Sequence, residues 1–242
     1  MTQNRRCVTI SILKLFGKVN INMKKTAVCL NVIFIVLSLA LDIALIITNI
    51  KVFKFTASVA FMIAATVNLI YVFKCVPSAK RPAVILTAGV FFAMSADIAI
   101  ELNFIMGAAL FAIGHICYIV SYSLMQRFHP TDLIPAAVLF VPCALFMVLF
   151  PGFDYGGVAM EALCLIYAVI ISVMAGKAVM NFLREKSRLS IILALGSVLF
   201  VISDIMVLMH GFSSIEAPFD ELCVSIYYPA QCLLANAFLH AK

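Results

Sequence analysis

Long apolar blocks separated by short polar or basic stretches run through nearly the whole chain. Four blocks contain no Asp, Glu, Lys or Arg over a membrane-spanning length, at residues 55–73, 102–126, 133–153 and 222–241. Four more blocks follow if one acid or a charged edge is tolerated, at about 26–48, 83–101, 156–178 and 189–210. Because a helix needs about 20 apolar residues to cross a bilayer, the pattern predicts an all-α, polytopic integral membrane protein with eight transmembrane helices.

The composition supports this interpretation and excludes several classes of protein. Of 242 residues, 65% are hydrophobic and only 12% are charged, about half the roughly 25% of charged residues in soluble domains. This composition excludes a soluble globule and a disordered chain. The long apolar blocks also exclude a transmembrane barrel, which would show alternating strands of about ten residues. The 8 cysteines are scattered singly without a Cys-x-x-Cys pair, so we interpret them as buried apolar side chains and expect neither a metal nor a cofactor.

The distribution of basic residues predicts the orientation in the membrane. If both termini lie in the cytoplasm, Lys51 and Lys54 are the only ones of the 17 Lys and Arg residues that fall in outer loops. Cytoplasmic loops carry the excess of Lys and Arg, so both termini are predicted to be cytoplasmic. The net charge of +6 is therefore a sign of topology and gives no reason to expect a nucleic-acid partner. The expected surroundings are a lipid bilayer, with a bacterial inner membrane favoured.

Residues 1–25 form a basic segment that we expect to be cytoplasmic, ahead of an eight-helix domain over residues 26–242. Met23-Lys24-Lys25 before an apolar run is typical of a bacterial start, which suggests that residues 1–22 lie upstream of the initiator. The apolar run after Lys25 is longer than the 7–15 residues of a signal-peptide core. We therefore expect a retained first helix.

A weak internal repeat links the third and seventh predicted spans. The segment from Gly89 to Asp97 is similar to the segment from Gly196 to Asp204, and each places Gly eight residues before Asp. These two spans run in the same direction, so a duplication of four plus four helices would be a parallel repeat.

Acids inside a membrane indicate function, because a charge near the bilayer centre costs at least about 2.5–3.5 kcal/mol. Asp97 and Asp204 end the repeated segments in the outer halves of their helices and are predicted to form one site, whereas Asp42 has no motif around it and is interpreted as structural. His115 shares a helix face with Tyr118 and lies near Asp97 in depth. Gln231, on a face with Tyr227 and Tyr228, needs a partner in hydrocarbon, and we expect that partner to be Asp204.

Together these residues resemble the YhhN-like lysoplasmalogenases, which are eight-span membrane proteins that cleave the vinyl ether bond of lysoplasmalogens. The resemblance covers roughly residues 84–238. The first block of motifs is Phe92-x-x-Ser95-x-Asp97 followed by Gly107-x3-Phe111-x3-His115-x-x-Tyr118. The second block is Gly196-x3-Phe200-x-x-Ser203-Asp204, then Phe212, then Tyr227-Tyr228-x-x-Gln231. The chain departs from the family pattern at Ala96, His210 and Ile226, where Gly, Asn and Thr are usual.

The resemblance implies a lysophospholipid substrate with a vinyl ether and a phosphate headgroup. Hydrolysis of a vinyl ether needs an acid that protonates carbon, a negative charge near the resulting oxocarbenium ion, and a placed water. Two carboxyl groups in unlike environments meet these needs in glycosidases, so Asp97 and Asp204 are the predicted catalytic pair. The expected supporting residues are His115, Tyr118, Tyr227, Tyr228, Gln231, Ser95 and Ser203, and the candidate headgroup residues are Lys51 and Lys54.

Two other classes of function use the same residues. A proton-coupled transporter or lipid-moving protein would use the acids as a relay and would need a polar path across both leaflets, whereas we expect the strong polar groups to cluster in the outer half. A metal-dependent lipid hydrolase would gather Asp97, Asp204, His115 and His210 around zinc, although the sequence has no His-Glu-x-x-His motif. A serine nucleophile is disfavoured because neither Ser95 nor Ser203 lies in Gly-x-Ser-x-Gly.

Overall fold

A computed structural model describes the backbone from Thr2 to Ala241 and the side chains of residues 22–241. The long helices are α1 (Thr2–Thr48), α2 (Lys51–Cys75), α3 (Lys80–Ala99), α4 (Phe104–Met125), α5 (Leu133–Leu149), α6 (Val158–Glu185), α7 (Arg188–Phe212) and α8 (Phe219–Asn236). Three short 3₁₀ turns are η1 (Pro77–Ala79), η2 (Pro130–Asp132) and η3 (Ala237–His240). Within residues 22–241, eight helical segments are long and apolar enough to cross a membrane. The predicted all-α, multi-pass architecture is confirmed.

Local sequence signals set where several helices begin and end. The Asn103 side chain accepts a hydrogen bond from the Met106 amide and caps α4. Ser187 and Ser190 form a capping box at the start of α7, which satisfies amides that the first turn leaves free. The predicted span 133–153 is too long, because α5 ends at Leu149 just before Pro151-Gly152, a pair that disfavours continuation of a helix.

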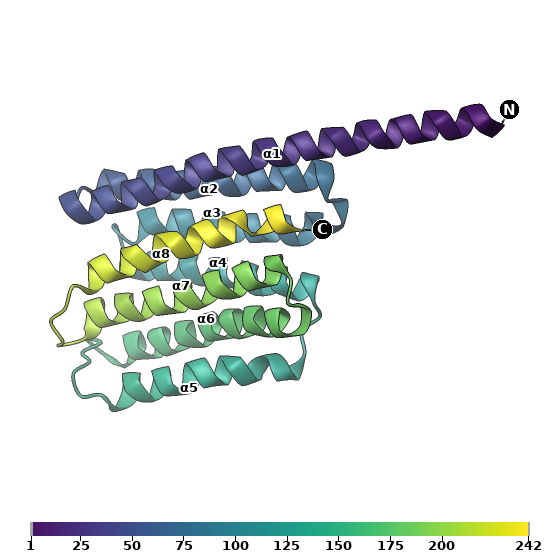
Figure 1. The fold of residues 1–242 in the computed structure, drawn as a ribbon. Helices are drawn as coiled ribbons and strands as arrows, with labels where there is room; N and C mark the ends of the chain where they lie inside the picture. The colour runs from purple at the N-terminus through teal and green to yellow at the C-terminus, as the bar shows by residue number, and fades with distance from the viewer. Residues whose placement is uncertain (1, 242) are drawn as a thin grey trace.

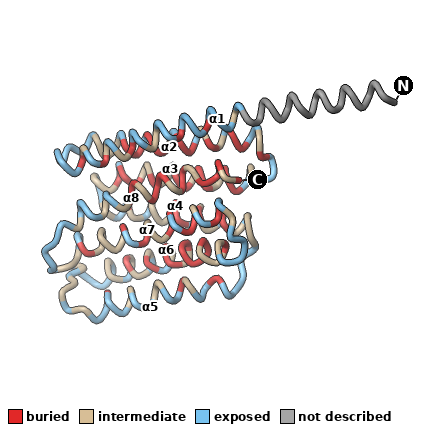
Figure 2. Tube along the Cα trace, viewed as in Figure 1, coloured by how far each residue is buried: buried red, intermediate tan, exposed pale blue. Residues whose placement is uncertain are grey.

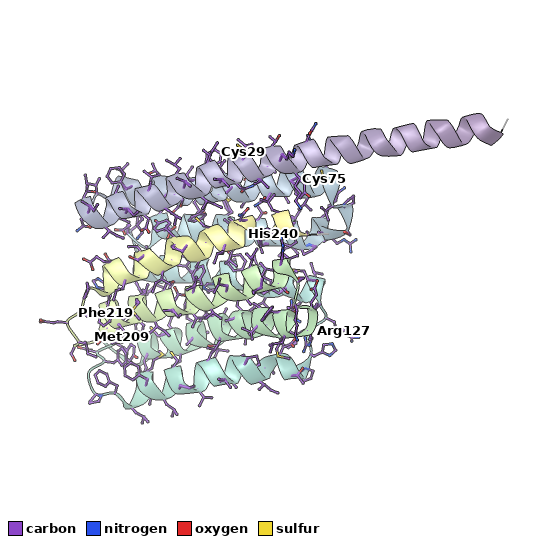
Figure 3. All side chains as sticks on the ribbon, in the orientation of Figure 1. Cys29, Cys75, Arg127, Met209, Phe219 and His240 are labelled. Atoms are coloured by element: carbon purple, nitrogen blue, oxygen red, sulfur yellow. The ribbon has the colours of Figure 1, made fainter. Side chains whose placement is uncertain are left out.

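Consecutive helices run antiparallel (Figure 1). Most consecutive pairs pack side by side, but α4 packs against α3 and α6 rather than against α5. We call the end with the α1–α2, α3–α4, α5–α6 and α7–α8 connections the predicted outer end, and the opposite end the predicted inner end. Figure 3 shows Met209 and Phe219 at the predicted outer end, and Arg127 and His240 at the predicted inner end. The C-terminus lies at the predicted inner end, which is also the end from which α1 extends beyond the bundle (Figure 1). Both ends of the helical domain therefore lie on one side, as an even number of spans requires.

The interior of the bundle lies around α8, which packs against α7, α2, α1 and α3. α5 lies at one edge and packs mainly against α6, and α1 lies at the other edge against α2 and α8. Figure 2 shows this division, because buried positions concentrate in the central helices while most of α5 is exposed. In α5, only Ala136 and Met147 are buried. The exposed apolar faces of α1 and α5 are suited to contact lipid.

Close approach at two glycines brings neighbouring helices together. A Cβ atom on Gly89 would lie 2.6 Å from Tyr118 Cε1, and one on Gly196 would lie 2.9 Å from Leu234 Cδ2. Small residues let membrane helices pack closely without a hydrophobic driving force between them. Both glycines of the repeated segments thus allow close helix packing, Gly89 between α3 and α4 and Gly196 between α7 and α8. The four-plus-four duplication itself stays a prediction.

Buried polar groups are not confined to the predicted outer half. In the inner half, the Asn31 and Asn68 side chains are hydrogen-bonded to each other at 2.9 Å, and Asn68 also donates to the Ala235 carbonyl. The Tyr122 and Ser197 hydroxyls lie 3.0 Å apart. The expectation that the strong polar groups cluster in the outer half is therefore wrong. In the inner half, these bonds satisfy polar groups between helices, where no water is present to do so.

A buried ion cluster attaches α5 to α6 at the predicted inner end. Lys177 Nζ lies 2.9 Å from Asp132 Oδ2 and donates to the Arg127 carbonyl at 3.1 Å, and Arg184 also pairs with Asp132. The Lys177 and Asp132 side chains are fully buried. The predicted span ends at about residue 178, which would put Lys177 at its edge. In the structure α6 continues to Glu185, so Lys177 lies two turns inside the helix.

The predicted boundary between a basic segment and the helical domain does not appear as a break in the backbone. α1 continues from Thr2 through residue 25 to Thr48. The interpretation of residues 1–22 as an upstream extension falls on side chains outside the described ones, and it stays a prediction.

Candidate active site

Two polar clusters lie in the predicted outer half, one around each repeated acid. Asp97 lies in the last turn of α3, and Asp204 lies eight residues before the end of α7. Among the described residues, no hydrogen bond or ion pair joins the two carboxyl groups directly. The two acids of the predicted catalytic pair therefore belong to two separate, neighbouring clusters.

The Asp97 cluster is enclosed by α2 and α8. Ser58 Oγ on α2 and Tyr227 Oη on α8 both donate to Asp97 Oδ2, the second at 2.8 Å. The Tyr228 hydroxyl donates to the Lys54 carbonyl at 2.9 Å and lies 3.4 Å from Ser58 Oγ. Asp97 is only 2% exposed, so a substrate has no direct access to its carboxyl group in this conformation.

The Asp204 cluster is built from α4, α6 and α7. Tyr167 Oη on α6 donates to Asp204 Oδ2 at 2.6 Å, and His115 Nε2 on α4 lies 2.9 Å from the same hydroxyl and 3.5 Å from the carboxylate. Because a phenol has one proton and Tyr167 gives it to Asp204, His115 Nε2 must donate to Tyr167. His115 Nδ1 then remains buried and without a hydrogen-bond partner. That atom could hold a water or a polar group of a ligand.

An apolar pocket opens beside Asp204. It encloses about 810 Å³, including the part open to the surroundings, and its walls come mainly from α4, α5, α6 and α7. The carboxylate of Asp204 and the phenol of Tyr167 are part of a wall made mainly of aliphatic and aromatic side chains. Asp204 is therefore the acid that a ligand in this pocket would meet.

An aromatic layer separates the two clusters. The Phe200 ring lies 4.7 Å from the His115 ring and 5.3 Å from the Tyr227 ring, and the Phe111 ring lies 5.8 Å from that of Tyr227. His115 thus contacts the Asp204 side of the layer and Tyr227 the Asp97 side. Aromatic rings therefore lie between the two acid clusters.

Gln231 does not bind Asp204, contrary to our expectation. Its Oε1 accepts from Tyr118 at 3.3 Å, and its Nε2 donates to Tyr227 Oη at 3.4 Å. The reason is the rotation of α8, whose Tyr227 and Gln231 face turns toward Asp97 and α4. Gln231 consequently orients two tyrosines on the Asp97 side.

The two serines of the motifs stay outside these networks. Ser95 Oγ donates to the Phe91 carbonyl, and Ser203 Oγ donates to the Phe200 carbonyl. Residues two apart on a helix point to nearly opposite sides, so Ser95 cannot accompany Asp97 into its cluster. The structure therefore does not bring either serine to an acid, and the supporting role of both stays a prediction.

Lys51 and Lys54 do lie at the predicted outer end, but they share an acid that the sequence analysis overlooked. Lys54 Nζ is 2.7 Å from Glu101 Oε1, and Lys51 also pairs with Glu101. Partial burial would raise the pKa of Glu101, but the hydrogen bonds and charges of the two lysines outweigh it and lower that pKa. An ionised Glu101 leaves this cluster with one net positive charge. Its position four residues after Asp97, at the end of the predicted span 83–101, was the available signal, although α3 itself ends at Ala99.

Tyr167 and Ser58 were also missed. Each lies in an apolar block, at a distance along the chain that gives no sign of contact with an acid. Ser58 precedes Asp97 by 39 positions, and Tyr167 precedes Asp204 by 37. Only the packing of α2 on α3 and of α6 on α7 brings them together.

The arrangement required by a metal-dependent hydrolase is not present among residues 22–241. No group of three or more His, Cys, Asp or Glu side chains there could hold a metal ion. His210 is exposed near the end of α7, two turns beyond Asp204, whereas His115 is buried beside Tyr167. The four residues of the proposed zinc set therefore do not converge.

Comparisons with known proteins identify the family. No curated protein and no solved structure is significantly similar to this chain. A family model described as the YhhN family matches residues 50–238, a range that begins just before α2 and includes both acid clusters, the pocket and the lysine pair. Since the match covers more than half of the chain, the protein belongs to the YhhN family.

Proposed function

We propose that this protein is a membrane-embedded lysoplasmalogenase, which hydrolyses the vinyl ether of an alkenyl glycerophospholipid to a fatty aldehyde and a glycerophospho headgroup. Membership in the YhhN family supports a hydrolase of this kind. The observation that carries the proposal is the carboxyl group of Asp204, hydrogen-bonded to Tyr167, in the wall of an apolar pocket at the depth of lipid chains.

The first step is proton transfer from Asp204 to the alkene carbon farther from the ether oxygen. The carbon bonded to oxygen becomes an oxocarbenium ion, and Asp204, now a carboxylate, lies beside the new positive charge and stabilises it. Water adds to that carbon and returns one proton to Asp204, which gives a hemiacetal. The hemiacetal then loses the glycerol oxygen as an alcohol and becomes the aldehyde, so one water is consumed for each bond broken.

Tyr167 and His115 hold the carboxyl group of Asp204 in position. Tyr167 fixes the carboxyl group toward the pocket, and His115 orients Tyr167 through Nε2. The unpartnered Nδ1 of His115 is the group that we assign to the attacking water, because a buried ring nitrogen without a partner favours a bound water. Asp97 acts through Tyr227, which lies against the aromatic layer, and supplies a second negative charge near the cation.

The headgroup phosphate is assigned to Lys51 and Lys54. These lysines pair with Glu101, and the residue before Glu101 in the chain, Ile100, lines the pocket. A phosphate bound to the net positive cluster would therefore lie at the predicted outer rim of the pocket. Attraction between exposed charges is weak, so we assign orientation more than affinity to this contact.

Purified protein in lipid nanodiscs with lysoplasmenylethanolamine tests the function directly. We expect a fatty aldehyde from the vinyl ether and no product from the saturated-ether and ester analogues, which have no alkene carbon to protonate. Absence of aldehyde from a protein that is folded and monodisperse would contradict the proposal. Release of a fatty acid from the ester would indicate an esterase instead.

A further inference from the structure

We propose that three basic residues at the predicted inner end, Lys24, Arg188 and His240, bind the headgroup of an anionic phospholipid in the adjoining leaflet. We call these three residues the inner basic cluster. The cluster lies at the opposite end of the bundle from the two acid clusters, so the inference does not depend on the proposed reaction. It names a lipid partner for a face of the protein that the reaction does not use.

Charge is distributed very unevenly between the two ends of the bundle. Among the described side chains, ten Lys and Arg residues lie at the predicted inner end with only two acids, Asp132 and Glu185. Lys177 and Arg184 both pair with Asp132. Glu185 accepts a hydrogen bond from Gln126. Within the described part of the chain, the inner basic cluster is therefore left without an acidic partner.

Helix packing brings the members of this cluster together from three elements. η3, which ends at His240, packs against α7, α2 and α1. Lys24 of α1 and Arg188 of α7 lie close enough to the His240 ring to act on it by charge repulsion. Figure 3 shows His240 between α1 and α7 at that end of the bundle. A phosphate among these side chains would replace their repulsion by attraction.

Helix formation gives no reason for a cation at the start of α7. Arg188 is the first residue of that helix, where the positive end of the helix dipole disfavours a basic side chain. Ser187 and Ser190 already cap this end without it. Arg188 is also exposed, so its guanidinium can reach an anion at the surface of the bundle.

The surroundings of Lys24 favour a lipid over a free phosphate ion. A surface hollow on α1 is lined by Lys24, Lys25, Val28 and Cys29. All four residues are exposed, and Val28 and Cys29 lie one turn closer to the middle of the membrane than the lysines. Ammonium groups thus lie next to an apolar surface, as at the boundary between the phosphates and acyl chains of a bilayer. Basic pockets between helices on the cytoplasmic side bind anionic headgroups in this way.

A lipid bound here would attach α1 more firmly to the bundle. α1 lies at one edge and packs against α2 and α8, and the family match begins after it, at residue 50. A phosphate between Lys24 and Arg188 would bridge α1 and α7. The lipid should therefore raise the thermal stability of the protein, because a ligand that binds only the folded state stabilises that state.

Thermal unfolding of the purified protein in a neutral detergent, followed by circular dichroism, tests the site. Dioleoylphosphatidylglycerol should raise Tm with a saturable dependence on its concentration, and dioleoylphosphatidylcholine should not. The attraction of one Lys or Arg to an anionic surface corresponds to about a fivefold change in affinity. Lys24→Gln and Arg188→Gln should therefore each raise the apparent Kd of the anionic lipid about fivefold, and the charge-conserving Lys24→Arg should not.

Arg127→Gln is the matched control, because it removes the same charge at the same end of the bundle but away from His240 (Figure 3). This variant should bind the anionic lipid as the wild type does. An equal loss in Arg127→Gln would show diffuse attraction to the whole inner face and overturn the site. Equal stabilisation by the two lipids would also overturn it. Glycerol phosphate carries the phosphate without acyl chains, and stabilisation by it at the concentrations used for phosphatidylglycerol would reject a lipid as the occupant.

Discussion

Tyr167 donates a 2.6 Å hydrogen bond to the carboxyl group of Asp204, from a helix 37 positions earlier in the chain. The same hydroxyl lies 2.9 Å from His115 Nε2, so three helices meet at one phenol. Asp204 therefore has a fixed orientation at the pocket wall, set by a residue that belongs to none of the sequence motifs.

Replacing Tyr167 by Phe removes only this hydroxyl. A hydrogen bond to a charged group contributes about 1.5–3 kcal/mol, so kcat should fall about 10- to 100-fold. Steady-state kinetics with lysoplasmenylethanolamine measure the loss. Tyr71→Phe, at a buried tyrosine near the predicted inner end of α2, is the matched control and should retain activity. Wild-type kcat in Tyr167→Phe would remove this residue from the mechanism.

Asp97→Asn and Asp204→Asn should each abolish turnover, because the amide keeps the shape but supplies neither a proton nor a negative charge. Asp42→Asn should have a much smaller effect, since Asp42 lies on α1 outside both clusters and its Oδ1 has no partner. Size-exclusion profiles establish folding before kinetics are compared. If either of the first two variants kept a tenth of wild-type kcat, a loss of only about 1.4 kcal/mol, the two-acid mechanism would be wrong.

Turnover in deuterated water should place one deuterium on the aldehyde carbon next to the carbonyl, because the acid delivers its proton to that carbon. Early trapping of the aldehyde, analysed by mass spectrometry, separates this from slow exchange by enolisation. Authentic aldehyde incubated in parallel gives the background. Early product without deuterium would point to attack at another atom and contradict carbon protonation by Asp204.

Asp132→Asn should destabilise the protein by about 3–5 kcal/mol, because it leaves the buried ammonium of Lys177 without its counter-charge. Thermal unfolding in detergent measures the change. It is followed by circular dichroism, because the chain has no tryptophan for fluorescence. The double variant Asp132→Leu with Lys177→Met replaces the pair by apolar groups and should recover much of the loss. A single variant as stable as the wild type would show that the buried pair does not anchor α5.

The two termini are predicted to be cytoplasmic, since only Lys51 and Lys54 of the 17 Lys and Arg residues are assigned to outer loops. In a bacterial host, a C-terminal green fluorescent protein fusion should be fluorescent and a C-terminal alkaline phosphatase fusion should be inactive. The reverse pattern would invert the topology and place both acid clusters in the cytoplasmic half.

The sequence by itself determined the number of spans, the approximate ends of the helices, and the two acids that deserve study. These features depend on quantities that act locally or along one helix. An apolar block of about 20 residues matches the length of a transmembrane helix. An acid within such a block carries a desolvation penalty whichever neighbours the helix packs against. Gly89 and Gly196 were informative for the same reason, because close helix packing requires a small residue at a given position.

Only the tertiary structure decided which side chains meet. In a membrane, the lipid-facing side of a helix is as apolar as its buried side, so hydrophobic periodicity gives little information about the rotation of each helix. That rotation turned Gln231 away from Asp204, placed Ser95 outside the site, and brought Tyr167 and Ser58 to the acids. It also buried Asp97 while Asp204 faces a pocket, an asymmetry that two similar segments of sequence do not contain, because it arises from the neighbours on each side.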